Sequence, residues 1–145
     1  MPGDVTIRAC LLEEAPLLPD FWRSAAAGES ATDDSTSINI LFKHREDAVL
    51  VAEVDGEVVG TVIAAFDGWR GNIYRLAVLP SHRGQGIARK LVREAEHRLS
   101  IQGAKRLVAL ASSHSETAAP FWDAMASDGW RPSHPGARYA KTLQR

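Results

Sequence analysis

Residues 73–88 read Ile-Tyr-Arg-Leu-Ala-Val-Leu-Pro-Ser-His-Arg-Gly-Gln-Gly-Ile-Ala, and the rest of the chain is arranged around them. The first half is an apolar run that ends at Pro80, which is typical of a β-strand. The segment after it repeats apolar residues at the spacing of one helix face: Ile87, Leu91, Ala95 and Leu99. The sequence therefore predicts a strand, a glycine-containing turn over 83–88, and a helix that ends near Gln102.

The turn between this strand and this helix has the composition of an anion-binding site. Backbone N–H groups in the first turn of a helix have no intrahelical partner and carry the positive end of the helix dipole. Gly84 and Gly86 lack Cβ atoms, so an anion can approach this backbone closely. Arg83 adds a full positive charge beside it. We expect a phosphate or pyrophosphate ligand here, and the alternative is a tight turn that binds nothing.

The spacing of the glycines separates this turn from two common phosphate-binding motifs. The chain lacks both the three spaced glycines of the dinucleotide fingerprint and the Gly-Lys-Ser/Thr ending of the nucleotide triphosphatase loop. The pattern Arg83-x-x-Gly86-x-Ala88, with its lead-in over 76–83, resembles the acetyl-coenzyme A pyrophosphate loop of the GNAT superfamily of N-acetyltransferases. Residues 67–71, Asp-Gly-Trp-Arg-Gly, are similar to those of small bacterial members.

The remaining segments predict an α+β domain. Alternating apolar residues predict strands, and Asp55-Gly56 is a strong signal for a hairpin between two of them. Asp33 or Asp34 is placed to cap the second helix. The expected strands are 5–9, 48–54, 57–66, 69–79, 106–111, a short one near 130, and 137–143. The expected helices are 11–26, interrupted at its start by Pro16 and Pro19, a segment after 34, 84–102 and 116–127.

This order of elements matches the GNAT order along nearly the whole chain. The resemblance implies a mixed six- or seven-stranded sheet with about four helices in α/β/α layers, within a single domain of residues 1–145. A strand, a crossing helix and another strand imply parallel pairing between 72–79 and 106–111, the second of which reads as buried on both faces.

The resemblance also implies where acetyl-coenzyme A lies. In the superfamily the two central parallel strands splay apart, and the pantetheine arm fills the gap. Splaying frees backbone groups of Ala77 and Val78, which can bond the pantetheine and stabilise the oxyanion formed when an amine attacks the thioester. The implied cofactor-binding residues are Ala77, Val78, Arg83, Gly84, Gln85, Gly86, Ile87, Ala88 and Ser115.

A second superfamily motif is matched with two substitutions. Where members carry Asn-x-x-Ala-x-x-[Leu/Phe]-Tyr, this chain has Ser115-x-x-Ala118-x-x-Phe121-Trp122. Ser115 can still hydrogen-bond the cofactor, with a shorter reach than asparagine. Trp122 replaces a tyrosine that commonly protonates the leaving thiolate, and an indole N–H is not a useful acid. The sequence therefore leaves the general acid open.

Tyr74 and His114 are the candidate catalytic residues. Tyr74 lies four residues before Val78, where relatives often carry a glutamate that deprotonates the acceptor through water. It is a candidate to shape the acceptor site or donate a proton, and a packed strand aromatic is the alternative. His114, in the polar loop after 106–111, has the titration range of a general base, unless it is an ordinary exposed histidine. Tyr139 is a weaker candidate.

The first two helices and their loop cover the acceptor site in the superfamily. Asp33 and Asp34 lie in that loop, and we favour a capping role for them over attraction of a cationic acceptor.

Composition excludes several other classes of protein. The formal net charge is −1, so neither nucleic acid nor a strongly charged partner is expected. No apolar run reaches membrane-spanning length, no signal peptide is visible, and the single cysteine, Cys10, suits a reducing compartment. We therefore expect a cytoplasmic protein. The histidines lack ligand spacing, so no metal site is expected.

Residues and resemblance together predict a small acetyl-coenzyme A-dependent N-acetyltransferase. The acetyl group would pass directly to an amine in a ternary complex, because the chain has no nucleophile elbow for an acyl-enzyme. The acceptor, a small-molecule or peptide amine, stays open, and so does a homodimer. The alternative is a non-catalytic acyl-coenzyme A-binding or sensory module with the same fold, which the substitutions at Ser115 and Trp122 keep open.

Overall fold

The computed structural model describes residues 3–109, 117–133 and 139–143. The chain divides into two compact units, residues 1–110 and 111–145, and each is described by itself. Among the described residues, the first unit contains a five-stranded sheet and the helices α1, α2 and α3, and the second contains α4.

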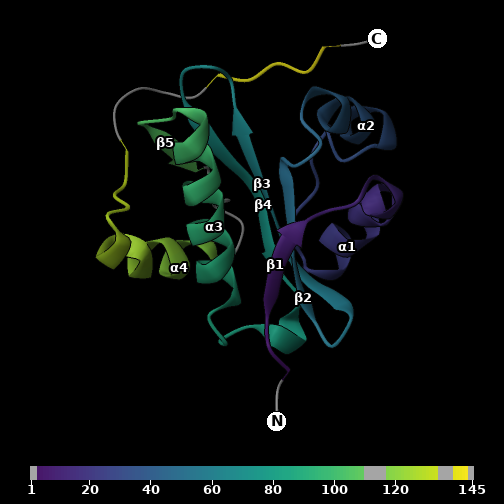
Figure 1. Cartoon of the computed structure of the whole chain (residues 1–145), viewed down its shortest axis with the longest axis vertical. Coiled ribbons are helices and arrows are strands. Elements are labelled where there is room, and N and C mark those ends of the chain that lie inside the picture. Colours follow the sequence, from purple (N-terminus) through teal and green to yellow (C-terminus); the bar gives the residue numbers. More distant parts are fainter. Residues whose placement is uncertain (1–2, 110–116, 134–138, 144–145) are drawn as a thin grey trace. The chain divides into compact units, whose positions relative to one another are not determined.

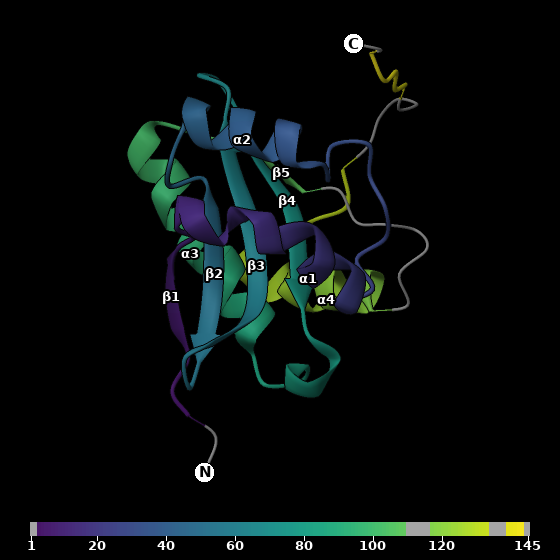
Figure 2. The ribbon, with the colours of Figure 1, turned by 90° about the vertical axis from the view of Figure 1, so that its right-hand side faces the viewer.

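The sheet of the first unit has the strand order β1-β2-β3-β4-β5. It is seen nearly edge-on in Figure 1 and more nearly face-on in Figure 2. Neighbouring strands from β1 to β4 are antiparallel, and β5 pairs with β4 in parallel, as the sequence predicts. The mixed sheet and the helices that flank it confirm the expected fold. The strands are β1 (Thr6–Ala9), β2 (Val49–Val54), β3 (Glu57–Phe66), β4 (Gly71–Val78) and β5 (Leu107–Ala109).

The hairpin between β2 and β3 follows its sequence signal closely. Asp55 and Gly56 both have positive φ angles, 51° and 81°. A two-residue turn with both central residues in this region matches the right-handed twist of the strands that it joins. The Asp-Gly pair therefore forms the expected tight turn between β2 and β3, and this prediction is confirmed.

Helices cover both faces of this sheet. Helix α3 (Ile87–Gln102) lies on one side, and α1 (Leu18–Ser24) and α2 (Ser35–His44) lie on the other (Figures 1 and 2). The core on the α1 and α2 side joins helix residues to sheet residues, among them Trp22, Ile38, Phe42, Val49, Val51, Ile63 and Ala77. The helix stripe read from the sequence is buried: Ile87, Leu91, Ala95 and Leu99.

The first expected helix, 11–26, is divided in two. A 3₁₀ helix, η1 (Leu12–Leu17), precedes α1, and Pro16 lies inside it. Proline removes a backbone donor and clashes with a preceding carbonyl, so a continuous α-helix cannot form across it. Helix α2 begins as predicted, because the Ser37 N–H donates to the Asp34 carboxylate over 2.7 Å.

Strand β4 contains a β-bulge that the sequence does not announce. Thr61 pairs with Ala77 and Ile63 pairs with Tyr74, so Val62 alone lies opposite two residues of β4. Arg75, one of those two, has a φ angle of 51°, a conformation that costs a non-glycine residue about 1–3 kcal/mol. The extra residue has a geometric consequence. Tyr74 and Ala77 are three positions apart but lie on the same face of the sheet.

Three expectations need correction. The described part of β5, Leu107–Ala109, is half-buried and not buried on both faces, and residues 110 and 111 of the expected strand lie outside the described residues. Helix α3 begins at Ile87 and not at Gly84, because Gly84 and Gly86 have positive φ angles that a helix excludes. Residues 130–133 and 139–143 are irregular, so the described parts of the last two expected strands are not formed.

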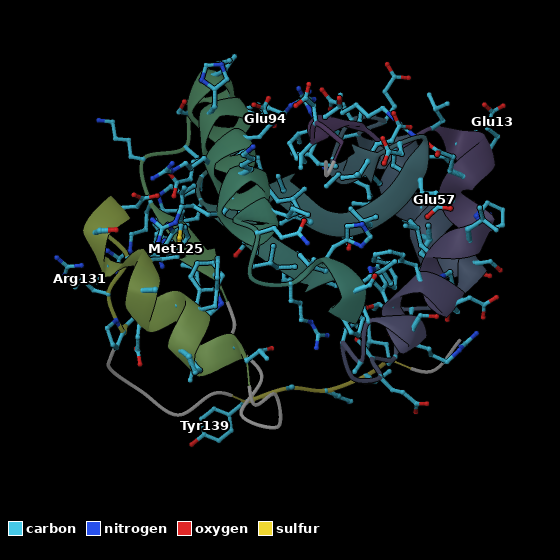
Figure 3. The ribbon with its side chains drawn as sticks, turned by 90° about the horizontal axis from the view of Figure 1, so that it is seen from below. Glu13, Glu57, Glu94, Met125, Arg131 and Tyr139 are labelled. Carbon is cyan, nitrogen blue, oxygen red and sulfur yellow. The ribbon has the colours of Figure 1, made fainter. Side chains whose placement is uncertain are left out.

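The second unit contains α4 (Ala118–Ala124), which continues into a 3₁₀ helix, η3 (Met125–Asp128). The Arg131 guanidinium donates to the Ala126 carbonyl over 2.7 Å and holds the chain that leaves η3 (Figure 3). In neither unit does a described helix have the length and apolar character needed to cross a membrane.

Candidate functional site

The loop between β4 and α3 has two glycines in a backbone conformation that other residues rarely adopt. Gly84 has a φ angle of 77° and Gly86 one of 81°, and Gly86 is the N-cap of α3. A Cβ atom built on either glycine would meet nothing within 4 Å. The glycines are therefore required by backbone conformation and not by packing, and the space beside them is open.

The start of α3 presents its amides next to this space. The first backbone bond of the helix runs from the Lys90 N–H to the Gly86 carbonyl over 3.1 Å. The N–H groups of Ile87 and Ala88 come before that bond and so have no acceptor within the helix. Ile87 is 1% exposed and anchors this end of α3 in the core. A helix start that is anchored in the core by Ile87 and has N–H groups without helical acceptors suits an anion such as pyrophosphate.

Arg83 makes two hydrogen bonds to backbone carbonyls in addition to the charge that it places beside the loop. Its Nε donates to the Val78 carbonyl over 3.1 Å, and its NH2 donates to the Ala25 carbonyl over 2.7 Å. The side chain therefore joins the end of β4 and the residue after α1 to the glycine loop. Its positive charge stays beside the loop, while its donors hold the backbone around it.

The C-terminal half of β4 extends past its parallel neighbour. Among the described residues, pairing with β5 covers Gly71–Ile73, whereas β4 continues to Val78. Ala77 and Val78 are buried, at 7% and 8% exposure. The Leu79 N–H donates to the Val59 carbonyl of β3 over 2.9 Å. Since successive residues of a strand direct their amides to opposite sides, the Val78 N–H points away from β3, toward the β5 side.

Tyr74 is 49% exposed and lies on the same sheet face as Ala77. It is therefore not a fully packed core aromatic. The other candidates lie elsewhere. His114 and Ser115 lie outside the described residues. Tyr139 in the second unit is 91% exposed, and Figure 3 shows its ring extending away from the ribbon.

Trp122 belongs to an aromatic cluster within the second unit. Its ring lies 5.1 Å from that of Phe121 in an edge-on arrangement and 4.8 Å from that of Trp130. Two aromatic residues of α4 and one from the chain after η3 thus meet in space. The indole supplies packing area at the position where relatives carry a tyrosine.

The two aspartates of the loop between α1 and α2 have separate roles. Asp34 caps α2, as favoured from the sequence. Asp33 forms an ion pair with Arg75, whose Nε donates to its Oδ1 over 2.9 Å. Sequence reasoning missed Arg75, although an arginine inside an otherwise apolar strand run is a signal for a buried polar partner.

Comparison with known proteins adds to this geometry. The model of the acetyltransferase (GNAT) family matches residues 14–126. An acetyltransferase of Photorhabdus laumondii is 39% identical over 88 residues, which cover 61% of this chain and 62% of that protein. The aligned part of this chain thus spans less than two thirds of that relative's length.

Two solved structures share the fold. One is a ribosomal-protein-alanine N-acetyltransferase from Brucella melitensis, with a TM-score of 0.71 and 22% identity, covering 97% of this chain and all of that one. The other is a predicted acetyltransferase from Clostridium acetobutylicum, solved with acetyl-coenzyme A, with a TM-score of 0.73 and 15% identity, covering 94% of this chain and 96% of that one.

Proposed function

Because the chain belongs to the acetyltransferase (GNAT) family, we propose that it is an N-acetyltransferase that moves the acetyl group of acetyl-coenzyme A directly to an amine. The observation that carries this proposal is the loop of Gly84 and Gly86, which opens a sixteen-residue helix beside unfilled space. The amides of Ile87 and Ala88 and the charge of Arg83 favour a doubly charged pyrophosphate there.

The pantetheine arm and the thioester would lie along the second half of β4. Val78 carries the amide that points to the β5 side, so we assign it the oxyanion-binding role and leave Ala77 as a lining residue. A single fixed N–H in a buried position stabilises developing charge without reorganisation at the moment of reaction. Ser115 remains a proposed cofactor contact on the sequence motif alone.

The chemistry needs one bond to form and one to break. The amine nitrogen attacks the thioester carbon, the oxyanion collapses, and coenzyme A thiolate leaves. A thiol has a pKa of about 8.5, so the thiolate can leave near neutral pH and take its proton from solvent. This fits a chain with Trp122 at the usual tyrosine position. Tyr74, half-exposed on β4, is the proposed side chain at the acceptor, and His114 is the proposed general base.

The acceptor is an amine whose class an assay has to establish. The Brucella structure is that of an enzyme named for a ribosomal-protein alanine, so a peptide with an N-terminal alanine belongs in the panel. Small-molecule amines and a lysine-containing peptide complete it. We also propose that residues 1–145 form one transferase domain, since the family match spans both units, and that the protein is cytoplasmic. A homodimer stays open.

The test is a titration with acetyl-coenzyme A followed by a free-thiol assay across the amine panel. Binding with thiol release for one amine supports the transferase. Binding without thiol release for every amine favours the alternative, a non-catalytic acyl-coenzyme A module. If acetyl-coenzyme A does not bind, both the transferase and the binding module are contradicted. Background from the protein is low, because Cys10 is buried and its burial raises the pKa of its thiol to about 11.

A near-isosteric change tests the pyrophosphate site itself. Gln85 is exposed in the glycine loop, and Gln85→Glu places a carboxylate next to the start of α3. A carboxylate there interacts favourably with the positive end of the helix dipole but repels a pyrophosphate. We expect unchanged or slightly raised thermal stability and about tenfold weaker binding of coenzyme A, equivalent to ~1.4 kcal/mol. Calorimetric titration and a thermal melt check this. Equal affinity of wild type and variant for coenzyme A would mean that the loop is not part of the cofactor site.

A further inference from the structure

The loop between α1 and α2 is held by the side chain of one strand residue. The Arg75 guanidinium donates to both carboxylate oxygens of Asp33, to the Ala27 carbonyl over 2.8 Å and to the Gly28 carbonyl over 3.1 Å. The pair is largely buried, with side-chain exposures of 15% and 21%. The guanidinium also lies 5.2 Å from the ring of Trp22, which supports it from the α1 side.

The same loop is held at its beginning from a second place. Arg83 of the glycine loop donates to the Ala25 carbonyl, just before the residues that Arg75 binds. The segment 25–33 is therefore fixed at both ends by two arginines, one on β4 and one in the proposed pyrophosphate loop. A segment tied down at this many backbone carbonyls has a defined position.

The β-bulge is what brings Arg75 to this loop. A buried hydrogen-bond chain fixes the bulge: the Trp22 Nε1–H donates to the Thr61 hydroxyl over 3.0 Å, and that hydroxyl donates to the Arg75 carbonyl over 2.9 Å. Thr61 is fully buried and lies opposite Ala77. Bulges redirect side chains in this way, and here the guanidinium reaches across the face that also carries Tyr74.

We propose that Arg75 is a positioning residue for the amine acceptor, which rests on the proposed transferase function. Through Asp33 and the carbonyls of Ala27 and Gly28, it holds segment 25–33 in a fixed position, as one wall of the acceptor site. This wall lies over the sheet face that carries Tyr74 and the buried end of β4, where the thioester would lie. The negative charge of Asp33 is consequently neutralised by Arg75 and does not attract a cationic acceptor. Acceptor binding depends on this wall, whereas coenzyme A binding depends on the glycine loop.

Two conservative variants and a matched control isolate this contact. Arg75→Gln and Asp33→Asn each remove one side of the pair, and the double variant removes both. Arg45→Gln is the control, because Arg45 pairs with Asp47 over 2.7 Å at an exposed site after α2. For each protein, amide hydrogen exchange is measured for the peptide covering 25–34, together with the Kd for acetyl-coenzyme A and the KM for the amine that the panel identifies.

We expect exchange in 25–34 to become at least about tenfold faster in both single variants and unchanged in the control. The KM for the amine should rise by about tenfold or more, because small displacements of a positioning segment have large kinetic effects. The Kd for acetyl-coenzyme A should stay within about twofold. Because both residues act through one contact, the double variant should be no worse than either single one.

Three results would overturn the proposal. Unchanged exchange in 25–34 would mean that Arg75 does not hold the segment. Faster exchange with an unchanged amine KM would make the contact structural only. An equal rise in the KM for the amine and in the Kd for acetyl-coenzyme A would mean that the contact between Arg75 and Asp33 affects the whole site and not the acceptor alone. If wild-type protein acetylates no amine, the transferase function fails and the acceptor role fails with it, while the exchange data still decide whether the segment is held.

Discussion

Thr61 is a buried polar residue whose hydroxyl joins a helix to a strained strand. It accepts a hydrogen bond from Trp22 and donates one to the carbonyl of Arg75. Both partners are far away in the sequence, 39 and 14 residues respectively. A hydroxyl that both accepts and donates can satisfy two buried groups at once, which an apolar residue of the same shape cannot.

Substitution of Thr61 tests this chain of bonds. Thr61→Val keeps the shape and leaves the indole N–H of Trp22 without an acceptor, so we expect a loss of about 1–3 kcal/mol in the free energy of unfolding. Thr61→Ser keeps the hydroxyl and loses one methyl group, so a loss of about 1 kcal/mol is expected. Urea denaturation gives both values. A valine variant as stable as wild type would show that the bulge does not need the hydroxyl.

Cys10 gives a second prediction at the residue scale. Its side chain is 3% exposed, and burial raises the pKa of the thiol to about 11. The thiolate is the reactive form, so the native protein should react with a thiol reagent at pH 8 far more slowly than a free cysteine does. Full reaction should appear in urea. Rapid labelling of the folded protein would mean that the β1–η1 connection opens readily.

The elements form where local signals agree with the tertiary fold. The Asp-Gly turn, the apolar stripe of α3 and the cap of α2 each rest on neighbours a few residues away, and each is found as predicted. The first helical segment is divided at Pro16 into η1 and α1, which is also a local effect, because proline interrupts the hydrogen bonding of an α-helix. The start of α3 shifted because two glycines adopt positive φ angles.

The cap of α2 is testable at the scale of one element. The Asp34 carboxylate accepts the Ser37 N–H at the start of the helix. Asp34→Ala should lower the free energy of unfolding by about 1 kcal/mol through loss of this cap. Thr36→Ala, two residues later at an exposed helix position, is the control and should change stability by less than about 0.5 kcal/mol. Equal effects of the two substitutions would contradict a specific capping role.

At the scale of the whole molecule, an ion cluster ties the edge of the sheet to the segment that follows β1. Arg8 of β1 binds Glu14 of η1 over 2.8 Å and Glu53 of β2 over 3.2 Å. The hydrogen bonds from Arg8, with one from the Leu11 N–H, lower the pKa of Glu14 from its usual 4.5 to about 2. Partly exposed pairs are screened by water, so their contribution is about 1–2 kcal/mol.

This cluster predicts part of the acid sensitivity of the fold. Because the pKa of Glu14 is lower in the folded than in the unfolded chain, its contribution is fully present above pH 4.5 and is lost as the pH falls from 4.5 to 2. Glu14→Gln should therefore be less stable than wild type at pH 7, and the difference should nearly vanish by pH 2. Urea denaturation across that range checks it. A stability difference between the two proteins that does not change with pH would mean that Glu14 contributes through packing and not through its charge.

The sequence by itself determined the order of most elements, the hairpin turn between β2 and β3 and the loop of residues 83–88. These follow from local periodicity, from the φ angles that glycine permits and from the short motif over residues 83–88. They were enough to indicate the family. The catalytic side chains were harder to predict, because single residues such as Tyr74 and His114 carry no periodicity.

Only the tertiary structure decided the β-bulge at Arg75 and the use of that side chain. The arginine and Asp33 are 42 residues apart, and the strained backbone between Tyr74 and Ala77 persists because Thr61 and Trp22 fix it from other elements. The hydrogen bonds from Arg83 to the carbonyls of Ala25 and Val78 were decided in the same way. Such contacts depend on which faces the fold brings together, and no local pattern encodes that.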